Sequence, residues 1–179
     1  MSESLRARWG WHQLSSPWAR RVVADADLRP GDLVLDLGAG TGALTEELVR
    51  VGARVIAVEL HPARYHELRR QLQGKNAIAV RADIRELRLP RRPFHVVANP
   101  PFSATAAVLR RLVAPGSRLV RADLVVPRHV VRRWTGGRAP GDGRWSWEFE
   151  AAAGRAVPRG AFRPPAPHDA MVLCIVRRP

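Results

Sequence analysis

Cysteine is almost absent from this chain, and so are lysine and long apolar runs. The one cysteine, Cys174, has no partner within the chain, which excludes an internal disulfide. No run of apolar residues reaches the length of a signal peptide or of a membrane-spanning helix. We therefore expect a protein of the reducing cytoplasm with no membrane partner.

The chain has 179 residues, 46% of them hydrophobic, which is enough for one globular domain with a sizeable core. A second domain of similar size would not fit. We expect a basic and aromatic N-terminal arm over residues 1–16 and a single domain over residues 17–179.

Positive charge dominates the composition. Lysine and arginine number 30 and acidic residues 16, so the net charge is +14, although only Lys75 is a lysine. Residues 110–179 alone carry 14 basic and 5 acidic side chains. A surface this basic suits a polyphosphate partner, because binding releases counterions. Nucleic acid is the leading prediction, and a solvated basic surface or an anionic lipid surface are the alternatives.

Short runs of Val, Ile and Leu alternate with helix-like segments, as in a parallel sheet that is buried on both faces. The runs predict strands at residues 33–36, 54–59, 78–82, 96–98 and 119–126. The segments between them predict helices at residues 43–51, 62–72 and 105–113. This alternation favours an α/β fold with a doubly wound sheet and right-handed crossovers.

The last part of the chain follows a different pattern. Residues 147–157 and 170–176 are strand-like, and the Pro-rich stretch 158–169 between them predicts no helix. A connection without a helix favours an antiparallel hairpin at one edge. The sum is a mostly parallel seven-stranded sheet with an antiparallel edge hairpin, and other mixed sheets fit the same pattern.

Two segments predict no regular structure. Residues 135–144 are rich in glycine and proline, which is typical of a flexible loop. Residues 2–16 are polar, basic and aromatic, and they precede a predicted helix over residues 17–26.

The glycine-rich segment Asp36-Leu37-Gly38-Ala39-Gly40-Thr41-Gly42 stands where a predicted strand turns into a helix. Glycines there let the backbone approach a ligand without obstruction by Cβ, which indicates a nucleotide-like cofactor. Dinucleotide enzymes use G-x-G-x-x-G at this place to hold a pyrophosphate. The order here is G-x-G-x-G, with an acid two positions before the first glycine, and this spacing favours S-adenosylmethionine.

S-adenosylmethionine has no phosphate, so its site needs acceptors for a ribose diol, an adenine and a charged amino-acid end. Glu59 follows the second strand and is placed to accept from both ribose hydroxyls. Asp83 follows the third strand and is placed to accept from the adenine amino group, with Ile84 as an apolar wall. Carboxyl ends of strands are where open α/β sheets bind ligands. Alternatively, Asp83 caps a short helix, and Glu59 pairs with Arg54 or Arg64.

The tetrapeptide Asn99-Pro100-Pro101-Phe102 follows the fourth predicted strand, again at its carboxyl end. The exocyclic amine of a base is a poor nucleophile because its lone pair is delocalised. The Asn99 side-chain carbonyl and the Pro100 backbone carbonyl can each accept one amine hydrogen, and Phe102 can stack on a flipped base. Positioning then supplies much of the rate without a strong base. The alternative is an ordinary Asn-Pro turn with a buried aromatic.

In these segments the chain resembles the ribosomal RNA adenine N6-methyltransferases, and above all the Erm macrolide-resistance methyltransferases. The similarity spans almost the whole chain. The matching segments are DLGAGTGALT (36–45), AVELHP (57–62), RADIRE (81–86), VVANPPF (96–102) and GAFRPPAPHDAMVL (160–173). The resemblance implies the class I methyltransferase variant of the Rossmann-like fold, S-adenosylmethionine as the cofactor and 23S ribosomal RNA as the partner.

The resemblance also distributes roles among residues. The cofactor contacts expected are His12, Leu14, Asp36, Gly38, Gly40, Gly42, Glu59, Asp83, Ile84 and Asn99, and the catalytic residues expected are Asn99, Pro100 and Phe102. Residues 10–14 take the place of the family's Ser-Gln-Asn-Phe-Leu box over the donor, where only Leu14 matches. His12 and Gln13 replace the Asn and Phe of that box, and Ala170 stands where the family usually has serine. Arg163 or His168, at the turn into the final strand, is expected to face substrate.

Erm-like enzymes usually carry a C-terminal helical domain that helps to hold RNA, and this sequence ends at Pro179, after the last predicted strand. We therefore expect a short form that holds RNA elsewhere. The surfaces expected to do so are the arm with Arg6, Arg8, Trp9 and Trp11, a loop with Arg128, Arg132, Arg133, Arg138 and Arg144, and the side chains of Trp145 and Trp147.

The function expected is S-adenosylmethionine-dependent mono- or dimethylation of an adenine N6 in 23S ribosomal RNA, by a monomer without a metal. Methyl groups at that atom remove hydrogen-bond donors and add bulk where a macrolide, lincosamide or streptogramin B contacts the exit tunnel, which gives resistance. The alternatives are a DNA adenine methyltransferase, a protein or small-molecule methyltransferase, and a non-catalytic RNA-binding assembly factor with the same fold.

Overall fold

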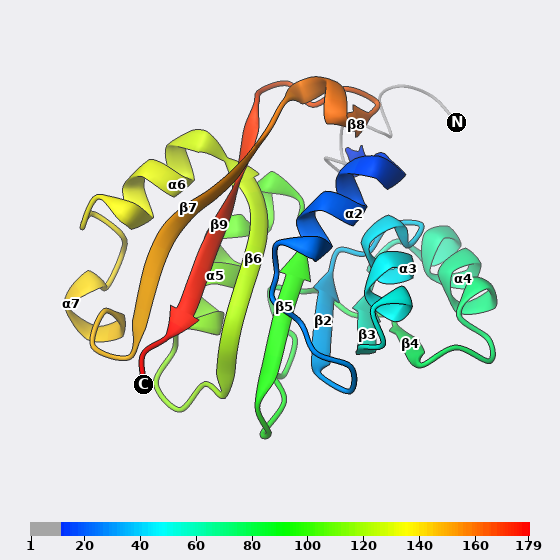
Figure 1. Ribbon diagram of the computed structural model, residues 1–179, viewed down its shortest axis with the longest axis horizontal. Coiled ribbons are helices and arrows are strands. Elements are labelled where there is room, and N and C mark those ends of the chain that lie inside the picture. Colours follow the sequence, from blue (N-terminus) through cyan, green and yellow to red (C-terminus); the bar gives the residue numbers. More distant parts are fainter. Residues whose placement is uncertain (1–11) are drawn as a thin grey trace.

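A computed structural model describes residues 12–179, which form a seven-stranded sheet with helices on both faces (Figure 1). The parallel strands are β2 (Leu33–Leu37), β3 (Arg54–Val58), β4 (Ala77–Val80), β5 (Phe94–Ala98) and β6 (Leu119–Pro127). Strand β9 (Ala170–Arg177) lies antiparallel to β6, and β7 (Phe149–Val157) pairs antiparallel with β9 at the edge. The predicted α/β class, the mostly parallel sheet and the edge hairpin are confirmed.

The strand order is β4-β3-β2-β5-β6-β9-β7. The chain therefore builds outward from β2 to β4 in one direction and from β5 to β6 in the other. The order reverses between β2 and β5, and an open α/β sheet binds its ligand at the carboxyl ends of the strands beside such a reversal.

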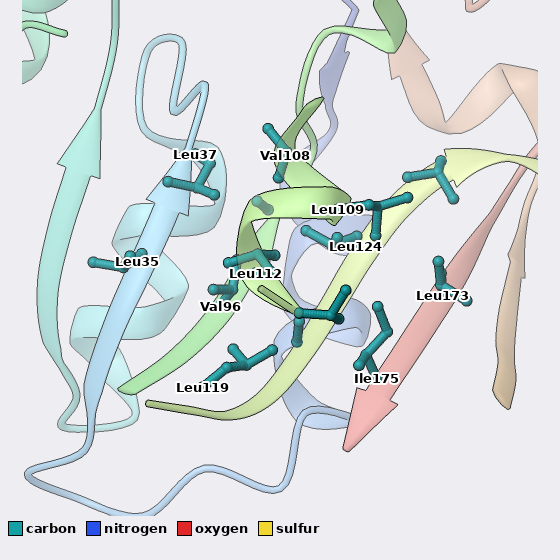
Figure 2. Packing of buried hydrophobic residues seen from close by; sticks show 14 of the residues in the cluster. Leu35, Leu37, Val96, Val108, Leu109, Leu112, Leu119, Leu124, Leu173 and Ile175 are labelled. Carbon is teal, nitrogen blue, oxygen red and sulfur yellow. The ribbon is translucent and has the colours of Figure 1, made fainter. Parts of the chain in front are cut away.

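Helices cover both faces of the sheet (Figure 1). On one face lie α2 (Ser16–Ala24), α3 (Ala43–Arg50) and α4 (Pro62–Gln71), and on the other α5 (Thr105–Leu112), α6 (Arg128–Thr135) and α7 (Asp142–Trp145). Figure 2 shows the second of these layers, where Leu109 and Leu112 of α5 pack with Leu124 of β6 and with Leu173 and Ile175 of β9. Each of these five side chains is at most 1% exposed. The 3–4 residue spacing on the helix and the two-residue spacing on the strands bring one apolar face of each together.

A second, two-stranded sheet was not predicted. Strand β1 (Gln13–Leu14) pairs antiparallel with β8 (Phe162–Arg163), and Leu14 lies opposite Phe162. Both strands fall in segments that the sequence predicts to be irregular. A two-residue strand has no periodicity to detect, and its partner is about 150 residues away in the chain.

The basic loop predicted around Arg128, Arg132 and Arg133 is wrong at those positions, because they belong to helix α6. The glycine-rich segment that follows α6 is largely irregular, as predicted, but it ends in the short helix α7. Trp145 is only 6% exposed and packs against Trp134 with 4.8 Å between ring centroids, so it is not the surface aromatic that was expected. Trp147 does lie on the surface. The arm residues Arg6, Arg8, Trp9 and Trp11 lie outside the described residues.

Between residues 12 and 179, no helix has the length and apolar character needed to cross a membrane. The same residues contain no group of three or more His, Cys, Asp or Glu side chains that could hold a metal ion.

Candidate functional site

A pocket with a cavity volume of about 250 Å³ opens at the carboxyl ends of β2, β3, β4 and β5. The structure brings these predicted residues to its walls: His12, Leu14, Asp36, Gly38, Gly40, Glu59, Asp83, Ile84, Asn99, Pro100 and Phe102. Gly42 is the one expected cofactor contact that does not line it. Gln13, Leu60, Arg64 and Arg85 line the pocket and were not predicted. Arg163 and His168, expected to face substrate, are exposed and do not line the pocket.

The glycine loop after β2 takes a left-handed backbone conformation at Gly38, Gly40 and Gly42, with φ of 79°, 59° and 94°. A Cβ on Gly38 would lie 3.0 Å from Cδ of Pro101, so this glycine lets the loop approach the Asn99–Phe102 segment closely. Gly42 is the N-cap of α3, and a Cβ there would lie 2.9 Å from Cδ1 of Leu68 in α4. Gly42 therefore lets the start of α3 lie close to α4, and it does not line the pocket.

Asp36 is a buried carboxyl at the floor of the pocket, with 1% of its surface exposed. Its Oδ2 accepts a hydrogen bond of 2.6 Å from the Thr45 hydroxyl, whereas its Oδ1 is buried without a hydrogen-bond partner. Burial raises the pKa of Asp36 to about 7; the hydrogen bond from Thr45 opposes the rise, and the nearby charge of Glu59 adds to it. An unpaired carboxylate oxygen in a pocket wall is suited to a cationic donor on a ligand.

Glu59 is 4% exposed and follows β3 directly. Its Oε2 accepts from the Gly40 amide at 2.9 Å, and its Oε1 accepts from the His61 amide at 2.7 Å. The Arg64 guanidinium lies 3.4 Å from Oε1, so the predicted alternative pairing with Arg64 is present. A carboxylate has about four acceptor sites, so these contacts leave capacity for the hydroxyls of a ligand.

Asp83 is held by a neighbour that the sequence did not single out. The Arg85 side chain donates to both carboxylate oxygens at 2.6–3.0 Å, and the Arg85 amide donates to Oδ1 at 2.9 Å. The hydrogen bond from the Arg85 side chain is the main cause that holds the pKa of Asp83 below its usual value. Since the Arg85 side chain is 60% exposed, a ligand can compete with it for Asp83.

Asn99 stands at the end of β5, between the glycine loop and the first described residues of the chain. Its Nδ2 donates to the backbone carbonyl of His12 at 2.6 Å. This bond turns the amide so that Oδ1 is available as an acceptor. Pro100 is buried, and Phe102 is half-buried at the start of the short 3-10 helix η1 (Phe102–Ala104).

Residues 12–15, which we call the roof segment, lie over the pocket. The Thr41 hydroxyl donates to Oε1 of Gln13 at 2.6 Å, which ties the segment to the glycine loop. On its other side the Ser15 amide donates to the Ala161 carbonyl at 2.9 Å, and His12 Nδ1 lies 3.3 Å from the Pro164 carbonyl. The one signal for Gln13 in the sequence was its place in the family's box over the donor.

The acceptors on these walls fit S-adenosylmethionine. The unpaired oxygen of Asp36 suits an ammonium group, and the remaining acceptor capacity of Glu59 suits a ribose diol. The two arginines that line the pocket, Arg64 and Arg85, lie against Glu59 and Asp83. The sheet and this pocket at its switch point define the class, which is that of the class I S-adenosylmethionine-dependent methyltransferases.

Comparison with known proteins narrows this class to a family. The family model described as "Ribosomal RNA adenine dimethylase" matches residues 3–178. The chain therefore belongs to the ribosomal RNA adenine dimethylase family. This confirms the predicted resemblance at the level of the family, and the Erm type within it stays a prediction.

The similar proteins include one named for the small ribosomal subunit and one named for 23S rRNA. The ribosomal RNA small subunit methyltransferase A of Thermosynechococcus vestitus is 36% identical over 184 residues, covering 95% of this chain and 69% of that protein. An rRNA methyltransferase of Streptomyces thermotolerans is 37% identical over 168 residues, covering 89% of this chain and 54% of that protein. The crystal structure of the 23S rRNA methyltransferase ErmE superposes with a TM-score of 0.82 at 30% identity, over 92% of this chain and 68% of that one.

Proposed function

We propose that this chain transfers methyl groups from S-adenosylmethionine to the N6 atom of an adenine in 23S ribosomal RNA, in the cytoplasm, and thereby gives resistance to macrolides, lincosamides and streptogramin B. The observation that carries the proposal is the Asn99–Phe102 segment at the wall of the pocket. There the Nδ2 of Asn99 is occupied by the His12 carbonyl and its Oδ1 is left to accept from a substrate.

The floor and walls of the pocket hold the cofactor. Asp36 Oδ1 accepts from its ammonium group, Glu59 accepts from the ribose hydroxyls, and Asp83 accepts from the adenine amino group beside Ile84. Arg85 must release part of its contact with Asp83 for the last of these. The cofactor would supply a methyl group on a positively charged sulfur, and breaking that methyl–sulfur bond would leave a neutral thioether as the leaving group.

The substrate adenine lies against Phe102, which stacks on the flipped base. Asn99 Oδ1 accepts one N6 hydrogen and the Pro100 backbone carbonyl accepts the other, which turns the nitrogen lone pair toward the methyl group. These two acceptors stabilise the positive charge that develops on N6. The proton then leaves to solvent, so no strong base is needed in the pocket.

The similar proteins support two different ribosomal RNAs as the substrate. The structural similarity to ErmE, whose name gives 23S rRNA as its substrate, favours the large subunit. Methylation of small-subunit ribosomal RNA is the second candidate function, because the relative from Thermosynechococcus vestitus and several others are named small subunit methyltransferase A.

The experiment is incorporation of labelled methyl into naked 23S and 16S ribosomal RNA, followed by mapping of the methylated nucleotide. The variants are Asn99→Ala and, as the matched control, Asn76→Ala, since the Asn76 side chain also donates to a backbone carbonyl but lies away from the pocket. We expect label in 23S RNA, a strong loss with Asn99→Ala and little change with Asn76→Ala.

Labelling of 16S RNA alone would replace the proposed substrate by the second candidate. Equal labelling by wild type and Asn99→Ala would remove the assigned role of Asn99. Drug tolerance of a sensitive host that expresses the wild type, compared with the Asn99→Ala variant, tests the resistance directly.

A further inference from the structure

An exposed tryptophan, Trp147, lies in the turn between α7 and β7. Figure 1 shows this turn at the end of the sheet where β7 begins and β9 ends. Trp147 is 82% exposed, whereas Trp134 and Trp145, its neighbours in the fold, are 5% and 6% exposed. The turn precedes Phe149, which pairs with Arg177 at the end of β9. The pocket lies beyond the other end of these strands.

Hydrogen bonds fix this turn in place. The Arg178 amide donates to the Glu148 carbonyl at 2.8 Å, and Arg178 Nε donates to the Ser146 carbonyl at 3.1 Å. The Glu148 amide donates to the carbonyl of the buried Trp145 at 3.0 Å. These bonds hold the backbone on both sides of Trp147, so less backbone conformational entropy is lost when the turn binds a partner.

Three exposed arginines belong to the segments that meet at this end of the sheet. Arg178 has a side-chain exposure of 49%, and Arg144 of α7 is exposed. Arg118 is exposed in the loop before β6, and the residues on either side of it, Ser117 and Leu119, accept hydrogen bonds from Arg177. The nearby acid Glu148 pairs with Arg177 at 2.8 Å, and Glu150 lies 4.0 Å from Arg178. We call Trp147 with Arg118, Arg144 and Arg178 the Trp147 surface.

We propose that the Trp147 surface is a second RNA contact, which binds single-stranded RNA that continues from the target adenine in the pocket. A base stacks on Trp147 and the flanking phosphates contact Arg118, Arg144 and Arg178. An aromatic side chain amid positive charge is the combination that binds single strands without reading their sequence. The inference rests on the proposed function, because it takes the RNA in the pocket as its starting point.

The geometry sets the length of RNA that is required. Strand β6 has 9 residues and runs from this end of the sheet to the pocket end, which is about 30 Å at about 3.3 Å per residue. A stacked strand advances about 3.4 Å per nucleotide, so about 15 nucleotides cover about 50 Å and reach from the pocket to Trp147. A hairpin with a stem much shorter than about 30 Å does not reach it without such an extension.

Binding of two fluorescently labelled RNAs to the full chain tests the proposal. One probe is a short hairpin with an unpaired adenine in its loop, and the other is the same hairpin with a tail of about 15 uridines, the length derived from the strand spacing. The variants are Trp147→Ala, Trp147→Phe and the control Ile78→Ala, which removes an apolar side chain that is 59% exposed on β4, at the other edge of the sheet.

We expect Trp147→Ala to raise the Kd for the tailed probe about tenfold, within the range for loss of one stacked base, and to leave the Kd for the hairpin unchanged. Trp147→Phe restores most of the affinity, because stacking is retained. Arg144→Gln reduces the salt dependence of tailed-probe binding by about 0.7 in the log–log slope, whereas the control Arg54→Gln, at the exposed start of β3, does not.

The same Kd for the tailed probe in wild type and Trp147→Ala would overturn the proposal. So would a change of oligomeric state in Trp147→Ala, seen by sedimentation, because it would assign the surface to a protein partner. Because binding is measured without turnover, the result stands apart from the methyl transfer assay. A chain that binds the tail through Trp147 but methylates no RNA would refute the proposed function alone.

Discussion

Affinity for S-adenosylmethionine is expected to fall as the pH drops below about 7, because of the carboxyl group of Asp36. Burial raises the pKa of this group to about 7, so the ligand-free pocket takes up a proton there near neutral pH. An ammonium group against the unpaired Oδ1 favours the ionised form and lowers the pKa in the complex. Binding below pH 7 must therefore expel a proton.

The size of the effect follows from that linkage. With the carboxyl ionised throughout in the complex, the Kd rises toward a limit of tenfold per pH unit, which gives about 15-fold between pH 7 and about pH 5.5. Above about pH 8 the α-amino group of the ligand loses its own proton, so affinity falls again on that side. Affinity plotted against pH is therefore bell-shaped. Protonation of Asp36 causes the fall on the acidic side, and deprotonation of the ligand causes the fall on the basic side.

Isothermal titration calorimetry in two buffers of different ionisation enthalpy measures both the Kd and the protons released. Asp36→Asn should bind the cofactor weakly and lose the acidic limb, while Glu46→Gln, an exposed acid on α3, should behave as wild type. A wild-type Kd that stays constant from about pH 5.5 to pH 7.5, with no proton released, would refute the assigned ion pair.

The Asp36 carboxyl has the opposite pH effect on the stability of the ligand-free protein, which falls as the pH rises. Its pKa is higher in the folded chain than the ordinary value of 3.8, so its contribution to stability is fully present below that value and is lost as the pH rises through about 7. Asp36→Asn keeps an acceptor for Thr45 and removes the buried charge. We expect its ligand-free Tm at pH 8 to exceed that of the wild type, as differential scanning calorimetry would measure.

Three further substitutions have defined outcomes. Arg85→Gln frees the Asp83 carboxylate and should lower the Kd for S-adenosylmethionine by about two- to fivefold, because an exposed ion pair contributes at most about 1 kcal/mol. A higher Kd would show instead that Arg85 contacts the cofactor. Phe102→Ala should raise the KM for RNA by at least about fivefold and leave the cofactor Kd unchanged, with Phe102→Tyr as the control that keeps stacking; equal KM values would exclude the stacking role. Gly42→Ala should lower the free energy of unfolding by about 2–4 kcal/mol, because its φ is left-handed and the new Cβ would lie 2.9 Å from Leu68. The control Gly116→Ala, with φ of 79° and no atom within 4 Å of the new Cβ, should lower it by only about 1 kcal/mol in the same urea unfolding experiment. Equal losses would mean that Leu68 moves aside at no cost.

The parallel strands could be predicted from the sequence because they are rich in Val, Ile and Leu, and the central strands β2 and β5 are buried on both faces. Each of the five parallel strands is a short apolar run, and the observed bounds differ from those predicted by at most about two residues. Helix α6 was missed because it is short, its three apolar residues (Val130, Val131 and Trp134) stand among three arginines and a histidine, and a glycine-rich stretch follows. Its apolar residues do share one face, but a segment of eight residues is too short for this pattern to predict a helix by itself, and packing against the sheet stabilises it.

The pocket residues could be predicted to the extent that topology places them. Asp36 lies near the carboxyl end of β2, and Glu59, Asp83 and Asn99 follow β3, β4 and β5, so all four meet at one edge of the sheet. The contact of Arg85 with Asp83 depends on a side-chain rotamer and carries no pattern in the sequence. Their roles in binding and transfer remain predictions that the experiments above address.

The pairing of β1 with β8 has a consequence for how the pocket exchanges its contents. Only two residues on each side hold this small ladder, whereas the strands beneath it belong to the seven-stranded sheet. Hydrogen bonds of His12, Gln13 and Ser15 and the buried Leu14 add to this ladder. We expect the roof segment to open by local unfolding more readily than the large sheet, so its amides should exchange hydrogen faster than those of β2. The rate of cofactor release after methyl transfer would then depend on the opening of the roof segment, which Phe162 and Ala161 hold in place. Substitutions in β8 would therefore change kcat although β8 contacts no reacting atom.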